Sequence, residues 1–130
     1  MTGLARRLGR LLVHDVRTGE TDVYPELKPL DLPLGPGPAF AAALAAARSM
    51  PGWTIASTVP ETGEIRAEAR TPRLGFVDDV RIQARPLSGG GTRVDVRSTS
   101  RVGIYDFGTN ARRIRAYLER LALRASPGTG

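Results

Sequence analysis

The sequence predicts an α+β fold, a two-layer sandwich in which two helices cover one face of a four-stranded antiparallel meander, preceded by an extended N-terminal segment. Three observations predict it. Four runs of alternating apolar and polar residues follow one another at 53–59, 64–71, 76–85 and 92–102. The links between them are short and rich in turn residues, as in antiparallel hairpins. A helical pattern precedes the first run and another follows the last, so the element order is α-β-β-β-β-α.

The residues before the sheet divide into an extended segment and a helix. Three prolines between residues 22 and 34 predict an extended path over the surface, because proline fixes φ and restricts the residue before it. A glycine- and proline-rich stretch at 35–38 ends this segment, and the alanine-rich residues 39–50 have high helix propensity. The expected inward stripe of this helix consists of Phe40, Ala43, Leu44 and Ala47.

After the sheet, residues 108–123 have the period of an amphipathic helix. Its apolar stripe consists of Ala111, Ile114, Leu118 and Leu121, with Tyr117 beside it. A chain of 130 residues suits one domain, which we expect to span residues 15–124. Residues 1–14 form a basic amphipathic segment, which we expect to pack on the domain or a partner, contact with a membrane surface being the alternative. We expect residues 125–130 to be a disordered tail.

Composition limits the chemistry and the partners. The net charge is +6, and Lys28 is the only lysine among 19 basic residues. Arginine makes forked contacts to carboxylates and phosphates, so this charge indicates either an acidic partner or solvated strand faces on which arginine alternates with Asp and Glu. The chain has no cysteine, and the single His14 cannot form a histidine metal site. We therefore expect no metal and no cofactor.

Sequence motifs of known chemistry are missing. The chain contains no P-loop, no dinucleotide-binding glycine fingerprint and no HExxH. No stretch approaches the apolar length of a membrane span, and the N-terminus lacks the uninterrupted apolar core of a secretion signal. These absences lead us to expect a cytoplasmic protein and to favour a non-enzymatic role.

The turn lengths fix a register for the predicted sheet. The three hairpins close at positions 58/64, 71/76 and 86/92. This register sets Trp53 opposite Ala69, Ala69 opposite Asp78, and Asp78 opposite Ser100. All three hairpins agree on one inward apolar set, which consists of Ile55, Ile65, Ala67, Val80, Ile82, Val94 and Val96.

One end of the inward face is polar, and an unpaired charge there would be costly to bury. The side chains that converge on this end, and that form the candidate ligand-binding set, are Trp53, Asp78, Ser98, Ser100, Asn110 and Arg113. They could form a small pocket with Trp53 as its wall, in which Asn110 and Arg113 hold an anion at the start of the last helix. They could instead form a buried latch between sheet and helix.

The outward face predicts rows of charge. The same register aligns Arg66, Arg81 and Arg97 in one row, with Glu68, Asp79 and Thr99 on one side and Glu64, Gln83 and Asp95 on the other, and it places Arg101 diagonal to Asp79. This face could be a solvated charge ladder, in which each pair contributes little. It could instead dock a second subunit or an acidic partner. We do not expect nucleic-acid binding, because aromatic residues for base stacking are missing from these positions.

The loop before the last helix carries residues with structural roles. Asp106 is a candidate helix cap, and Gly103 and Gly108 suit a turn that needs special backbone angles. Together with the preceding strand they belong to one continuous stretch, RSTSRVGIYDFGTNARRI, at residues 97–114.

This stretch, with EIRAEART at 64–71 and FVDDV at 76–80, resembles the uncharacterised bacterial family known as domain of unknown function 1499. The resemblance covers residues 15–123 and implies no activity, ligand or cofactor. Relatives often carry an N-terminal membrane or export segment, and we expect none here. The positions that match the family pattern are Asp78, Asp79, Arg97, Ser98, Ser100, Arg101, Gly103, Asp106, Gly108, Asn110, Ala111, Arg113 and Ile114.

These observations predict a non-enzymatic binding module for a small anionic ligand or a protein partner, at the polar cluster between the sheet end and the start of the last helix. Two alternatives stay open. One is an enzyme that uses a desolvated Asp78 as general base. The other is a structural homodimer joined through the arginine-rich outer face of the sheet.

Overall fold

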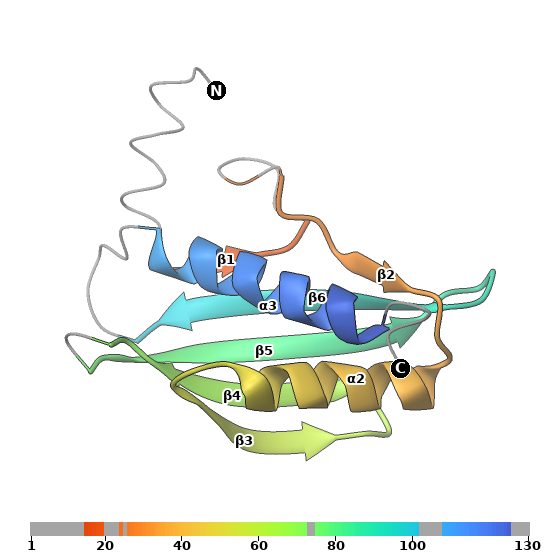
Figure 1. The fold of residues 1–130 in the computed structure, drawn as a ribbon, viewed down its shortest axis with the longest axis horizontal. Coiled ribbons are helices and arrows are strands. Elements are labelled where there is room, and N and C mark those ends of the chain that lie inside the picture. Colours follow the sequence, from red (N-terminus) through yellow and green to blue (C-terminus); the bar gives the residue numbers. More distant parts are fainter. Residues whose placement is uncertain (1–14, 20–23, 25, 73–74, 102–107, 126–130) are drawn as a thin grey trace.

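A computed structural model describes residues 15–19, 24, 26–72, 75–101 and 108–125 of the chain. Strands and helices form two layers, as Figure 1 shows. The elements in chain order are β1 (Asp15–Arg17), β2 (Leu30–Leu32), α2 (Pro36–Ser49), β3 (Trp53–Val59), β4 (Glu64–Arg70), β5 (Val77–Pro86), β6 (Thr92–Ser100) and α3 (Thr109–Ala125). The predictions for residues 1–14 and for most of the tail at 125–130 lie outside the described residues, whereas Ala125 is the last residue of α3 and is buried.

The described residues form a sheet of six strands, two more than predicted. Its order is β1-β6-β5-β4-β3, and β2 also pairs with β6, every pair being antiparallel. The strands β3 to β6 form the predicted meander, whereas β1 and β2 pair with opposite halves of the outer edge of β6. The predicted four-stranded sheet was therefore too small. The segment before the first helix, expected only to be extended, supplies two edge strands.

The predicted register is confirmed at the positions that decide which side chains face the helices. Trp53 lies opposite Ala69, Ala69 opposite Asp78, and Asp78 opposite Ser100. The closure of the first hairpin was wrong by one residue, because Glu64 pairs with Val59. An irregularity in β3 between residues 55 and 57 shifts the register and restores the predicted pairing at the polar end.

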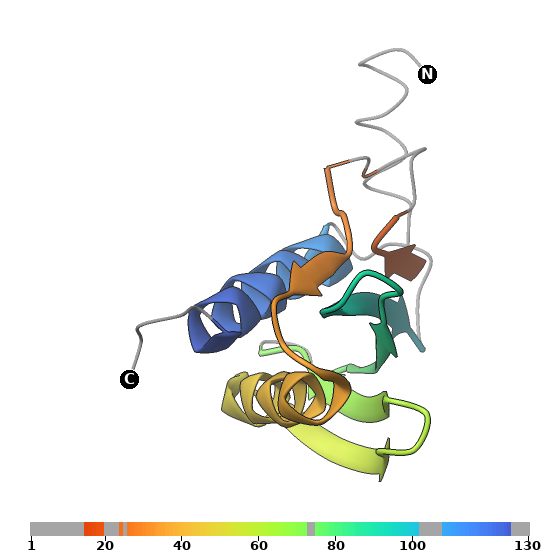
Figure 2. The same ribbon diagram turned by 90° about the vertical axis from the view of Figure 1, so that its right-hand side faces the viewer.

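Both helices cover the same face of the sheet, as the turned view in Figure 2 shows. Helix α2 begins at Pro36, three residues before the predicted start, because proline is tolerated in the first helical turn. Phe40 and Leu44 of the predicted stripe are only partly buried. The buried residues of α2 are all small and consist of Ala39, Ala43, Ala46 and Ala47. Small side chains let α2 approach the sheet closely.

The core lies between the sheet and the helices. Six of the seven predicted inward residues of the strands are buried, and the seventh, Ile55 on the edge strand β3, is partly buried. Helix α3 contributes Ile114, Tyr117 and Leu121, each fully buried. This arrangement places the N-terminal end of α3 over the ends of β5 and β6, where the sheet face becomes polar (Figure 1).

Candidate functional site

The structure brings five of the six candidate residues into one group joined by hydrogen bonds and an ion pair, hereafter the polar cluster: Asp78, Ser98, Ser100, Asn110 and Arg113. The hydroxyl of Ser98 donates to Asn110 Oδ1 at 2.6 Å, and Asn110 Nδ2 donates to the hydroxyl of Ser100 at 2.8 Å. Arg113 Nη1 lies 2.7 Å from Asn110 Oδ1, 3.0 Å from Ser98 Oγ and 2.8 Å from Asp78 Oδ2. The prediction that these groups converge is confirmed.

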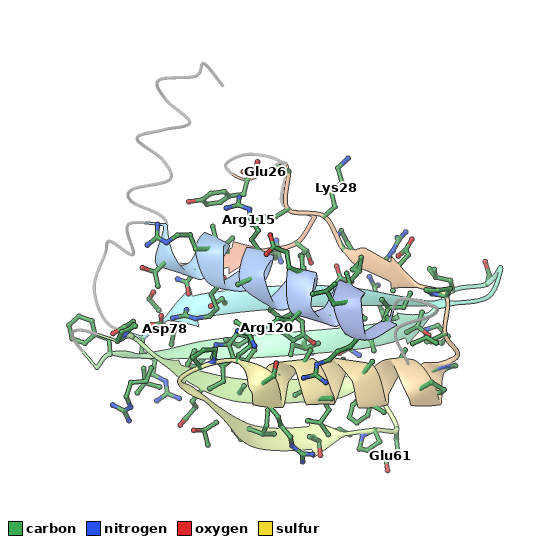
Figure 3. All side chains as sticks on the ribbon, viewed as in Figure 1. Glu26, Lys28, Glu61, Asp78, Arg115 and Arg120 are labelled. Carbon is green, nitrogen blue, oxygen red and sulfur yellow. The ribbon has the colours of Figure 1, made fainter. Side chains whose placement is uncertain are left out.

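Most of the polar cluster is buried, whereas Ser100 is partly buried. Ser98 and Asn110 are fully inaccessible, and the side chains of Asp78 and Arg113 are 4% and 8% exposed. Figure 3 shows Asp78 at the end of the sheet, near the start of α3. Hydrogen bonds from β6 and an ion pair from β5 connect the strands to the first turns of α3. Because polar groups are costly to bury unless they are paired, this pairing holds the helix start against the strand ends.

The sixth candidate residue, Trp53, lies on the inward side of β3 and packs against α3. Its ring stacks on Tyr117, with 5.5 Å between ring centroids and 15° between planes. The Tyr117 hydroxyl donates to the backbone carbonyl of Ala43 at 2.9 Å, which ties α3 to α2. Burial raises the pKa of Tyr117 well above its ordinary value. Trp53 therefore uses one face of its ring for packing between the layers.

Four arginines stand in register across four adjacent strands on the outer face, hereafter the arginine row. Arg17 on β1 lies opposite Arg97 on β6, Arg97 opposite Arg81 on β5, and Arg81 opposite Arg66 on β4. The side chains of Arg66, Arg81 and Arg97 are 56%, 50% and 47% exposed. Sequence reasoning found these three and missed Arg17, since a three-residue strand gives too short an alternation to recognise.

Carboxylates flank the arginine row on both sides. Asp15 accepts from Nε and Nη2 of Arg97, and this pairing holds the pKa of Asp15 below its ordinary value. Glu64 accepts from Arg66 on one oxygen and from Arg81 on the other, so that Arg66 and, secondly, Arg81 lower its pKa. Two arginines of the row thus share one carboxylate.

Asp79, Arg97 and Arg101, which match the family pattern, also lie on the outer face. Arg101 donates to both oxygens of Asp79 and to Glu68, which lowers the pKa of Asp79. The predicted register placed Arg101 diagonal to Asp79, and in the structure the two side chains are in contact. Gly108 has φ of +79°, which confirms its special backbone angle. Gly103 and Asp106 lie outside the described residues, so their roles stay predictions.

The outer face has a hollow on each side of Arg81 and Arg97. The first, hereafter the Arg85 hollow, has a volume of about 480 Å³, and its charged and hydroxyl-bearing walls are Arg17, Thr18, Arg81, Arg85, Asp95 and Arg97. The second, hereafter the Arg101 hollow, measures about 560 Å³, and its charged walls are Arg66, Glu68, Asp79, Arg81, Arg97 and Arg101. Arg81 and Arg97 therefore form a basic ridge between two concave surfaces.

The part of the chain that the structure describes shows no cluster of three or more His, Cys, Asp or Glu residues suited to a metal ion. Within that same part, no helix combines the length and the apolarity that crossing a membrane requires.

The fold and the polar cluster define an α+β protein in which an antiparallel sheet carries two helices on one face and charge on the other. The model of a family described as a protein of unknown function (DUF1499) matches residues 12–121, and the chain belongs to that family. The resemblance found in the sequence is thereby confirmed.

The fold resembles that of a solved structure. The crystal structure of protein CV1439 from Chromobacterium violaceum matches with a TM-score of 0.55 and 17% sequence identity, over 88% of this chain and 98% of that one. At this identity the likeness concerns the fold alone. No curated protein matches the chain.

Proposed function

We propose that the chain is a non-enzymatic binding module that holds an anionic ligand on the outer face of its sheet. The observation that supports this proposal is the arginine row. Like charges directly opposite one another destabilise neighbouring strands, and the row contains three successive arginine pairs. Departures from the rules that stabilise a fold are expected at functional sites. A bound anion would remove the repulsion that the row creates.

The balance of charge along the row favours an anion over a self-neutralised ladder. Arg66 and Arg81 share the single carboxylate of Glu64, and the other described residues give neither of them an ion pair. One positive charge therefore remains at the centre of the outer face. Guanidinium groups suit this task, because they stay charged and present several donors in a fixed plane.

The polar cluster, by contrast, has the geometry of a structural latch. Its side chains, apart from the partly buried Ser100, are buried, and they donate and accept mainly among themselves, while Trp53 stacks on Tyr117. Ligand binding at the cluster, and general-base catalysis by Asp78, would both require this network to open. We therefore assign it the role of fixing α3 on the sheet, which also fixes the positions of Arg97 and Arg101 on the opposite face.

The homodimer alternative is less well supported than anion binding. A symmetric dimer uses the same surface on both copies. Pairing through the outer face would bring two arginine rows together, in a chain whose net charge is already +6. The repulsion between copies would have to be offset by anions between them.

Calorimetric titration with inorganic tripolyphosphate at low salt tests the proposal. Arg81→Gln, at the centre of the row, should weaken binding about tenfold, the value of one charge-assisted hydrogen bond. Arg93→Gln is the matched control: Arg93 lies on the same face but is paired with Asp31 and lines neither hollow. It should change binding less than about threefold.

Equal weakening by both variants would mean that only net charge matters, and it would contradict a site on the row. Binding should also decline with added salt, but the difference between the two variants should persist at about 0.15 M, where unspecific surface attraction is largely screened. Loss of that difference would likewise count against the proposal.

A further inference from the structure

The two hollows beside the arginine row differ in charge. Four arginines line each of them, but the Arg101 hollow includes the carboxylates of Glu68 and Asp79, whereas the Arg85 hollow includes only that of Asp95. The Arg85 hollow is therefore the more cationic of the two. Its volume of about 480 Å³ falls within the range of sites for small molecules.

The carboxylate in the Arg85 hollow is already occupied. Asp95 Oδ2 accepts from Arg85 Nη2 at 2.6 Å, and Asp95 Oδ1 accepts from the hydroxyl of Thr18 at 3.1 Å. Both oxygens of Asp95 thus have a donor. Because each oxygen of Asp95 accepts a hydrogen bond, Asp95 repels a bound anion less than a free carboxylate would.

Three arginines of this hollow have N–H groups that are not used in contacts with the described residues. Arg81 and Arg97 use Nε and Nη2 toward Glu64 and Asp15, and Arg85 uses Nη2 toward Asp95. Among the contacts of the described residues, Nη1 of these three side chains has no acceptor. Three guanidinium groups from two neighbouring strands therefore offer N–H groups at the same hollow.

The wall opposite these arginines is held in place. The backbone N–H of Thr18 donates to the carbonyl of Val96 at 2.9 Å, and the N–H of Val96 donates to Thr18 Oγ1 at 3.0 Å. The next residue, Gly19, donates its N–H to the carbonyl of Leu27 at 2.9 Å. These bonds close the gap between β1 and β2 along β6. A pre-formed wall reduces the entropic cost of ordering the site when a ligand binds.

We infer that the Arg85 hollow binds the phosphate group of a small phosphorylated molecule. A phosphate monoester carries a charge near −2 and three acceptor oxygens, which suits several guanidinium groups better than a planar carboxylate does. None of the described residues that line this hollow is aromatic, so the site would read the phosphate rather than stack on a base. This inference rests on the proposed function and specifies its ligand class and location.

Titration with phenyl phosphate, followed by 31P NMR and calorimetry, tests the inference on the intact chain. Two variants remove the same charge. Arg85→Gln alters the Arg85 hollow but not the row, and Arg66→Gln alters the row but lines only the Arg101 hollow. Both side chains are more than half exposed, so both variants should fold. We expect about tenfold weaker binding for Arg85→Gln and less than threefold for Arg66→Gln.

Two results would overturn the inference. One is equal or greater weakening by Arg66→Gln. The other is absent binding of phenyl phosphate while longer polyphosphates bind with increasing affinity, which would indicate a linear polyanion along the row. In either case the proposed function survives if Arg81→Gln still weakens tripolyphosphate binding more than Arg93→Gln does. If Arg81→Gln has no effect on any anion, the proposed function fails as well.

Discussion

The carboxylate of Asp78 on β5 lies 2.8 Å from Nη1 of Arg113 on α3, and both side chains are almost fully buried. This ion pair joins the end of the sheet to the second turn of the helix. Asp78 lies next to β6, and the residues of β6 alternate between the two faces of the sheet. Ser98 and Ser100 turn inward to the polar cluster, whereas Arg97 turns outward to the arginine row. The stretch that begins at residue 97 therefore builds both the latch and part of the candidate binding face.

Removing the charge of Asp78 should destabilise the protein strongly. In Asp78→Asn the guanidinium of Arg113 stays buried without a counter-ion, and breaking a buried pair in this way costs about 3–5 kcal/mol. Urea unfolding followed by circular dichroism measures the free energy of unfolding. Asp79→Asn is the matched control, because Asp79 and its partner Arg101 are both about half exposed, and it should cost less than about 1 kcal/mol.

A double-mutant cycle distinguishes the ion pair from a general effect of mutation. Arg113→Met combined with Asp78→Asn should be less destabilising than the sum of the two single changes, by about 1–3 kcal/mol. Additive costs would show that the two side chains do not act together. A stability of Asp78→Asn equal to that of the wild type would contradict the latch and would reopen the general-base alternative.

Much of the site followed from the sequence, because side chains on a strand alternate and short turns fix the register. That argument placed Asp78 opposite Ser100, and Arg81 between Arg66 and Arg97, as the structure has them. It survived the misplaced closure of the first hairpin because the irregularity in β3 compensates for it.

The rest could not be derived, since it depends on contacts between distant segments. Strands β1 and β2 have three residues each and take their place from pairing with β6, at sequence separations of more than 50 residues. Arg17 joins the arginine row only through that pairing. The stack of Trp53 on Tyr117 likewise depends on where α3 settles over the sheet, and helix periodicity alone does not determine it.

The hydroxyl of Tyr117 should contribute measurably to the packing of the two helices. Tyr117→Phe removes the hydrogen bond to the carbonyl of Ala43 but keeps the ring that stacks on Trp53, so we expect a loss of about 0.5–1.5 kcal/mol. Tyr117→Leu removes the stack as well and should cost at least about 2 kcal/mol. Urea unfolding monitored by Trp53 fluorescence measures both. Equal costs for the two variants would contradict the separate role of the hydroxyl.

Acid should remove the contribution of Asp15 to stability. Its pKa in the folded state lies below the ordinary value of 3.8, chiefly because Arg97 donates to it. The carboxylate therefore stabilises the folded state above pH 3.8, and this stabilisation is lost as the pH falls through the lower, folded-state pKa. The difference in unfolding free energy between wild type and Asp15→Asn should be present at about pH 7 and should shrink below about pH 3.5.

Arg97→Gln provides the control for this pH dependence. Without the guanidinium, the main cause of the lowered pKa is gone, so replacing Asp15 by Asn in that background should have a much smaller effect at neutral pH. Urea unfolding at several pH values measures all four proteins. A difference between wild type and Asp15→Asn that stays constant from about pH 7 to pH 2.5 would show that charge on Asp15 is not the cause.

The β3–β4 turn should tolerate no side chain at Gly63. This residue has φ of +77°, and a Cβ atom there would lie 2.1 Å from the carbonyl oxygen of Ala84 on β5. The N–H of Ala84 also donates to the carbonyl of Gly63 at 2.9 Å, so the turn cannot move away without losing that bond. Gly63→Ala should therefore cost more than about 2 kcal/mol, the left-handed conformation and the clash both contributing.

Gly89→Ala, in the β5–β6 turn, is the control. Its Cβ would meet nothing within 4 Å and its φ is not positive, so the change should be neutral or stabilising by up to about 1 kcal/mol. Thermal and urea unfolding of both variants decide the matter, and a Gly63→Ala protein as stable as Gly89→Ala would contradict the close approach of this turn to β5.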